Sequence, residues 1–207
     1  MRAFLILILL LLPCAASASG VSVEVRTAAG APVPNAVVSL YPGGRPAPIT
    51  GASRSFQIGQ RDLQFSPFVL VAPVGSQVSF PNFDNVRHHV YSFSPVRRFE
   101  LRLFARAQSR SILFDRAGIV PVGCNIHDNM IAFVAVSDTA LAAKTDAAGR
   151  VTFPSVPVGN VTARVWHPYS RAPGGQVELR WAVPRAGTLR QTVALRLRAP
   201  PRPDQHY

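Results

Sequence analysis

A cysteine, a histidine and a methionine lie close together in one short stretch of this sequence. Cys124, His127 and Met130 follow one another at intervals of three residues. Thiolate, imidazole and thioether form a soft ligand set, which favours copper over magnesium or calcium. One Cys, two His and a weak axial Met together make a mononuclear blue-copper site. The stretch supplies three of these four ligands, so a second imidazole has to come from elsewhere in the chain.

The second imidazole is expected from the adjacent pair His88 and His89, which precedes the cysteine in the chain. Neighbouring side chains of a strand leave opposite faces, so only one of the two histidines should point at the metal. Strand alternation by itself leaves open which one it is. A structural zinc site is the alternative metal, although zinc prefers four Cys or His ligands and Met is not in its usual set.

The thiol of Cys124 supports the metal interpretation. Taken singly, a Cys or a Met is more often a core residue than a ligand. The chain holds two cysteines, and the other, Cys14, lies in an N-terminal leader, where Pro13 fits lipoprotein processing poorly. An unpaired thiolate in an oxidising compartment reacts unless it is buried or metal-bound, which favours ligation.

The first nineteen residues are typical of a secretory signal peptide. Arg2 gives a basic start, residues 4–12 an apolar run, and Ala16-Ser17-Ala18 a small-residue cleavage pattern. The apolar run is too short for a stable membrane anchor, so we expect no transmembrane segment after cleavage. The protein is therefore expected in the periplasm, with its mature N-terminus near Ser19 or Gly20.

The charge of the chain is strongly positive. The formal net charge is +12, and Lys144 is the only lysine among the cationic residues. Such a field steers a protein toward an acidic-faced redox partner or an anionic surface, although a merely solvated basic face is the alternative. Export and the lack of a nucleic-acid motif argue against nucleic acid as the partner. The densest cluster of arginines is Arg97, Arg98, Arg102, Arg106 and Arg110.

The hydrophobic pattern predicts an all-β chain. Short alternating runs rich in Val, Phe and Leu recur between Gly/Pro turn signals, and no long stretch has helical periodicity. Strands are expected at residues 21–26, 36–41, 63–65, 68–71, 77–80, 88–93, 99–104, 111–114, 119–122 and 131–136.

One segment before the cysteine resembles the cupredoxin family. Asn82, Asp84, His88 and Val90 match the Asn-x-Asp-x-x-x-His-x-Val stretch that carries the first copper ligand in plastocyanin-like domains. This register favours His88 as the ligand. The chain departs from the family at His89, where cupredoxins commonly have Asn.

The Cys-x-x-His-x-x-Met loop is similar to the compact loop of amicyanin. The nearest named group is the plastocyanin-like one often labelled methylamine utilization proteins. The aromatic positions usual before the cysteine are not aromatic here. The resemblance implies a Greek-key β-sandwich with one type 1 copper ion. It implies four metal ligands: His88, Cys124, His127 and Met130.

The two flanks of this region resemble the two halves of a carboxypeptidase-regulatory-like, or prealbumin-like, β module. Residues 21–40 match its first half, and residues 145–161 match its second. We therefore expect a cupredoxin sandwich inserted in, or packed on, a split β-sandwich. Two unrelated β pieces are the alternative. The expected parts are residues 1–19 as signal peptide, 20–54 and 139–199 as the β module, 55–138 as the cupredoxin domain and 200–207 as a disordered tail.

These features predict a periplasmic blue-copper protein that carries single electrons and is not an enzyme. No small-molecule substrate is inferred, because the sequence shows no acid–base constellation. Two alternatives remain: a copper-binding or copper-delivery protein, and an interaction module in which copper is structural.

Overall fold

The computed structural model describes residues 18–51 and 55–200. Most of the predicted signal peptide and of the predicted tail, together with Cys14, lies outside these residues. The described chain is made of strands and one short 3-10 helix, η1 (Pro173–Gly175), so the all-β prediction is confirmed. No helix in these two ranges is long and apolar enough to cross a membrane.

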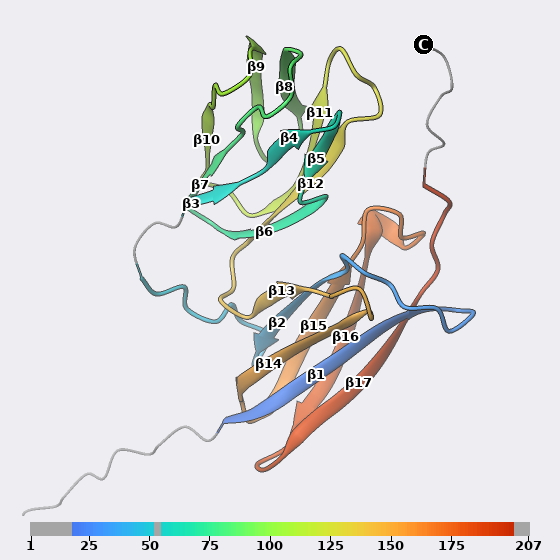
Figure 1. The fold of residues 1–207 in the computed structure, drawn as a ribbon. Coiled ribbons are helices and arrows are strands. Elements are labelled where there is room, and N and C mark those ends of the chain that lie inside the picture. The colour runs from blue at the N-terminus through green and yellow to red at the C-terminus, as the bar shows by residue number, and fades with distance from the viewer. Residues whose placement is uncertain (1–17, 52–54, 201–207) are drawn as a thin grey trace, which may run out of the picture.

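The middle of the chain folds into a central sandwich, drawn in cyan, green and yellow in Figure 1. Its strands are β3 (Ser55–Gln57), β4 (Gly59–Arg61), β5 (Gln64–Ser66), β6 (Val69–Pro73), β7 (Ser76–Ser79), β8 (His88–Phe93), β9 (Arg98–Phe104), β10 (Ser111–Phe114), β11 (Gly118–Cys124) and β12 (Ile131–Ser137). One sheet has the order β6-β12-β11-β8-β9, a second has the order β10-β7-β3, and β4 pairs with β5.

Alternating side chains fill the space inside the central sandwich. Val90 of β8, Val120 of β11 and Val134 of β12 are fully buried, as are Phe80 and Phe114. Because neighbouring side chains of a strand alternate between its two faces, the residues next to these valines form the outer face of the five-stranded sheet.

Strands from both ends of the described chain build an outer sandwich. They are β1 (Ala18–Thr27), β2 (Val37–Pro42), β13 (Ala142–Lys144), β14 (Arg150–Pro157), β15 (Gly159–Trp166), β16 (Gln176–Val183) and β17 (Thr188–Leu195). The sheet orders are β14-β1-β17 and β13-β2-β15-β16, so each sheet combines an early strand with late ones. The central sandwich is thus inserted between the two halves of the outer one (Figure 1).

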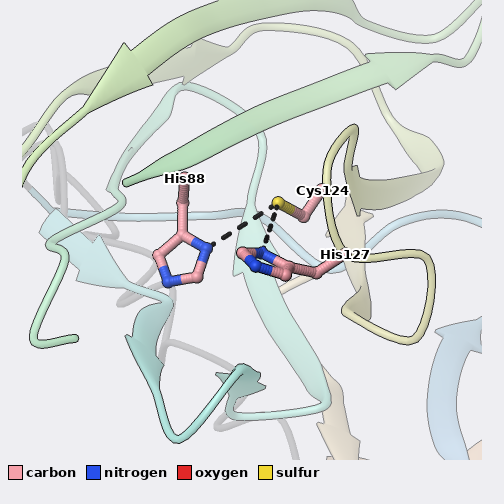
Figure 2. Close-up of side chains that lie close together, drawn as sticks. All are labelled: His88, Cys124 and His127. Carbon is pink, nitrogen blue, oxygen red and sulfur yellow. Dashed lines mark hydrogen bonds between the residues drawn. The ribbon is translucent and has the colours of Figure 1, made fainter. Parts of the chain in front are cut away.

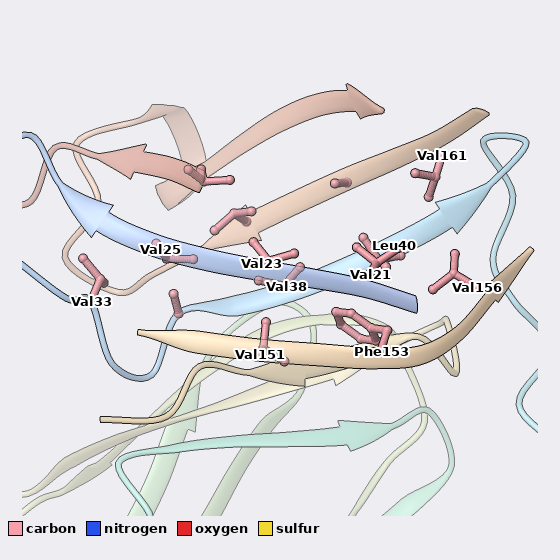
Figure 3. Packing of buried hydrophobic residues seen from close by; sticks show 14 of the residues in the cluster. Val21, Val23, Val25, Val33, Val38, Leu40, Val151, Phe153, Val156 and Val161 are labelled. Atoms are coloured by element: carbon pink, nitrogen blue, oxygen red, sulfur yellow. The ribbon is translucent and has the colours of Figure 1, made fainter. Parts of the chain in front are cut away.

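The outer core is built from small β-branched residues. Val21, Val23 and Val25 alternate along β1 and are all fully buried, and Phe153 of β14 packs in the same cluster (Figure 3). Gly149 makes the turn before β14 with a φ of +73°, and a Cβ there would lie 2.5 Å from the carbonyl oxygen of Val25. Only glycine fits this turn without displacing β1.

An aromatic contact joins the two sandwiches. The ring of Phe133 on β12 lies edge-on to Trp166 on β15, with centroids 5.7 Å apart. Val69 and Ala135 are buried in the same cluster, and Lys144 Nζ donates a hydrogen bond to the carbonyl oxygen of Val69 at 2.9 Å. The outer sandwich therefore covers the β6–β12 side of the five-stranded sheet's outer face.

Candidate metal centre

Strand pairing brings the predicted ligands together at one end of the central sandwich. Cys124 is the last residue of β11 and pairs with Val90 on the antiparallel strand β8. His88 begins β8 and points to the same inner face as Val90, because the two are separated by one residue. Figure 2 shows His88, Cys124 and His127 converging from β8, β11 and the loop that follows β11.

The three side chains lie within metal-binding distance of one another. Cys124 Sγ lies 3.8 Å from His88 Nδ1 and 3.6 Å from His127 Nδ1. All three candidate ligand atoms fall within 4.8 Å of each other. The thiol and the His88 imidazole are buried, whereas His127 is partly exposed at the molecular surface. Solvent therefore reaches the candidate site at His127 and not at His88 or Cys124.

Backbone hydrogen bonds close the loop between Cys124 and Met130. The Cys124 N–H donates to the Met130 carbonyl at 3.2 Å, and the Met130 N–H donates to the His127 carbonyl at 3.0 Å. Met130 is 1% exposed and belongs to the central core. The fourth predicted ligand therefore lies buried at the end of the loop that carries the thiol and the imidazole.

The paired histidines point to opposite sides of the sheet. His88 is fully buried beside Cys124. The side chain of His89 is 14% exposed, and its Nε2 lies 3.0 Å from Glu100 Oε1 on β9. The chain brings His88, and not His89, to the candidate site, in agreement with strand alternation.

Asp84 orients the imidazole of His88. Its Oδ2 lies 2.8 Å from His88 Nε2, and its two oxygens accept the N–H groups of Asp62 at 2.6 Å and Leu63 at 3.2 Å. A carboxylate acceptor requires the proton on Nε2, which leaves the Nδ1 lone pair facing Cys124. Burial raises the pKa of the Asp84 carboxyl, but the hydrogen bonds from His88 and the two amides outweigh it and hold the pKa below its usual value.

Asn82 fixes the segment that carries Asp84. Its buried amide donates to the carbonyl oxygens of Val86 at 2.8 Å and Phe104 at 3.1 Å, and its Oδ1 accepts the Asp84 N–H at 2.8 Å. Residues 82–88 are therefore tied to β9 and to the turn between β4 and β5.

The His127 imidazole is favoured in its neutral form. Burial lowers the pKa of His127 below its usual value, and the neighbouring His88 ring lowers it further, while Asp84 opposes both effects. A neutral imidazole is the form that binds metal ions.

The spacing and chemistry of these side chains fit a bound metal ion. With metal–sulfur and metal–nitrogen bonds of about 2.3 and about 2.0 Å, trigonal or tetrahedral geometry places S and N ligands about 3.5–3.7 Å apart. The observed separations of 3.6 and 3.8 Å are close to this range. One thiolate and two imidazoles, with Met130 at the end of the same loop, supply the kinds of donor that copper prefers.

Two neighbours of the site were not given a role by sequence reasoning. The first is Asp84, which is part of the motif before the cysteine. Its position four residues before His88 could have indicated that the two side chains interact. The second is Tyr91, whose ring covers Gly123: a Cβ on this glycine would lie 3.1 Å from the Tyr91 ring and hydroxyl. An aromatic ring from β8 thus occupies the space beside the residue before Cys124.

The architecture confirms the cupredoxin-like fold expected from the sequence: an all-β sandwich in which a His from one strand meets a Cys–His–Met loop between two others. The resemblance of the outer sandwich to a carboxypeptidase-regulatory-like module stays a prediction.

Comparisons with known proteins give matches to part of the chain. No protein-family model and no curated protein sequence matches it. Among solved structures, a purple cupredoxin from Nitrosopumilus maritimus is 23% identical, with 40% of this chain and 99% of that chain covered and a TM-score of 0.37. An amicyanin from Paracoccus versutus is 19% identical, and the match covers 42% of this chain and 85% of that chain with a TM-score of 0.37. A copper-containing nitrite reductase from Thermus scotoductus is 21% identical, and the match covers 45% of this chain and 25% of that chain with a TM-score of 0.39.

The role of Asp84 is testable in the copper-free protein. Asp84→Ala removes the acceptor of one imidazole and two backbone N–H groups, so we expect the free energy of unfolding in urea to fall by about 1–3 kcal/mol. Asp128→Ala, at an exposed loop position, is the control and should change it by less than about 0.5 kcal/mol. Equal effects of the two variants would contradict the assigned role.

Proposed function

We propose that this protein is an exported one-electron carrier with a single type 1 copper ion bound by His88, Cys124, His127 and Met130. The observation that carries the proposal is the convergence of one buried thiol and two imidazole Nδ1 atoms at metal-binding spacing. A carrier needs a soft, partly covalent ligand set and no substrate pocket at the metal, which fits a thiolate held in a packed core.

The scaffold supports rapid electron exchange because it restrains its ligands in advance. When bound, copper supplies the one-electron couple, alternating between Cu(I) and Cu(II). Asp84 holds the His88 ring from the side away from the thiol, and the core around Val90 holds the strand. The loop hydrogen bonds restrain His127 and Met130 relative to Cys124. Rigid ligands keep the site's geometry similar in both oxidation states, so little reorganisation accompanies each transfer.

Asp84 acts as a positioning residue and not as a catalytic base. Its two oxygens are engaged by His88 and by the amides of Asp62 and Leu63. This arrangement favours a carrier over an enzyme.

The proposal is tested by the optical and EPR spectra of the copper-loaded mature protein. Cys124→Ser should abolish the visible thiolate-to-copper band, because the transition requires the sulfur. Met130→Leu should keep the band and shift the reduction potential, since an axial thioether bond is weak. A wild-type spectrum in Cys124→Ser would refute the blue-copper assignment.

The histidine pair gives a second test by the same spectra. His88→Ala should destroy the blue site, because the lost imidazole opens the ligand plane to water. His89→Ala is the matched control and should retain copper with a modest spectral change. The reverse pattern would show that His89 is the ligand.

The proposed export places the carrier in the periplasm. The leader should be removed near Ser19 or Gly20, which retains the paired part of β1 from Ser19 onward. N-terminal sequencing of protein from the periplasmic fraction measures this. Recovery of the intact leader on cytosolic protein would argue against export.

A further inference from the structure

The outer surface of β8 and β9 carries an exposed aromatic side chain. Phe93, at the end of β8, is 68% exposed, the highest value among the large hydrophobic residues of the described ranges. Its ring lies 4.9 Å from that of Tyr91, and the guanidinium of Arg98 lies 5.1 Å above it. We call the surface formed by His89, Tyr91, Phe93, Arg98 and Arg102 the β8–β9 face.

The two sandwiches leave this face uncovered. Ile119, Phe133 and Ala135 lie on the same side of the five-stranded sheet and pack against Trp166 of the outer sandwich. Gly123 pairs with Tyr91, so the β8–β9 face continues the covered surface across the sheet. His89 and Tyr91 lie nearer the metal end, and Phe93 and Arg98 lie at the opposite end of the two strands. The β6–β12 side of this sheet face is thus buried within the chain, while the β8–β9 side presents Phe93 to solvent and leaves Tyr91 partly exposed.

The β8–β9 face is positively charged. The side chain of Arg102 is 87% exposed, and its nearest carboxylate, Glu100, lies 4.0 Å away and is itself exposed. An exposed ion pair of this length contributes little energy, so the guanidinium remains available to a partner. On the face itself, two exposed arginines, Arg98 and Arg102, stand against one acidic side chain, Glu100, which is paired with His89 at 3.0 Å. This balance favours an acidic surface opposite.

The face is also in contact with Gly123, the residue before the candidate thiol ligand. The Tyr91 ring packs directly on Gly123, the residue bonded to Cys124. Any side chain at position 123 would displace this ring, because a Cβ there meets three ring or hydroxyl atoms at 3.1–3.2 Å. A protein bound over Tyr91 is therefore separated from Gly123 by one aromatic ring.

From these observations we infer that the β8–β9 face is the docking surface for a redox protein with an acidic face. Phe93 and Tyr91 form the apolar centre of the contact, and Arg98 and Arg102 form its charged rim. This inference rests on the proposed electron-carrier function. With copper bound by His88, Cys124, His127 and Met130, one electron would pass between that site and the partner, which would be reduced or oxidised by the same single electron, with no proton transferred.

The experiment measures docking separately from copper chemistry. The probe is an acidic c-type cytochrome in its diamagnetic reduced form, titrated at low salt into the ¹⁵N-labelled mature protein with and without copper. Amide shifts should concentrate on β8, β9 and Gly123 and should vanish at high salt. If the proposed function is wrong, the copper-loaded protein will lack the visible thiolate band. If this inference is wrong, the amide shifts of the copper-free protein will not concentrate on β8, β9 and Gly123.

Charge-matched variants locate the surface. Arg98→Glu/Arg102→Glu should raise the Kd at least about tenfold, since rim charges control such encounters. Arg180→Glu/Arg185→Glu, at exposed positions of the outer sandwich, makes the same change in net charge and should alter the Kd by less than about twofold. Phe93→Ser should weaken binding without changing charge, and unchanged amide spectra elsewhere would show that each variant is folded.

Two results would overturn the inference. Equal weakening by both arginine pairs would mean nonspecific attraction to a basic protein. Weakening by Phe83→Ser/Ile126→Ser but not by the β8–β9 variants would place docking on the other exposed apolar residues, those beside the Asp84 segment and the metal loop.

Discussion

The pairing of Cys124 with Val90 across β11 and β8 is the contact on which the rest of the site depends. It places the thiol beside the strand that begins at His88, and it brings the residue before the thiol against Tyr91. A shift of one residue in this register would send His88 to the outer face and His89 inward. The buried side chains on both strands oppose such a shift, because it would expose Val90 and Val122 to solvent.

Restraints on the ligands come from three separate parts of the chain. Asp84 holds His88 through a segment that Asn82 ties to β9, and the turn at Asp62 and Leu63 holds Asp84 in place. The metal loop has its own backbone hydrogen bonds. The outer sandwich packs on the β6–β12 side of the sheet, away from this loop (Figure 1). The contacts that join the two sandwiches therefore involve other residues than those that restrain the candidate ligands.

The sequence by itself determined the candidate ligands, the class of fold and the positions of most strands. Those conclusions rest on local patterns: the three-residue spacing of Cys124, His127 and Met130, and the alternation of apolar residues along strands. That His88 and His89 face opposite sides followed from strand geometry alone.

Only the tertiary structure decided which groups distant in the sequence lie together. The hydrogen bond that orients His88 needs Asp84, whose position depends on the turn between β4 and β5. The ring beside Gly123 comes from Tyr91 of another strand, although sequence reasoning looked for an aromatic residue within β11. The parallel pairing of β1 with β17 likewise joins the two ends of the described chain. Strand partners and register depend on burying whole faces against one another, and no short stretch of sequence specifies them.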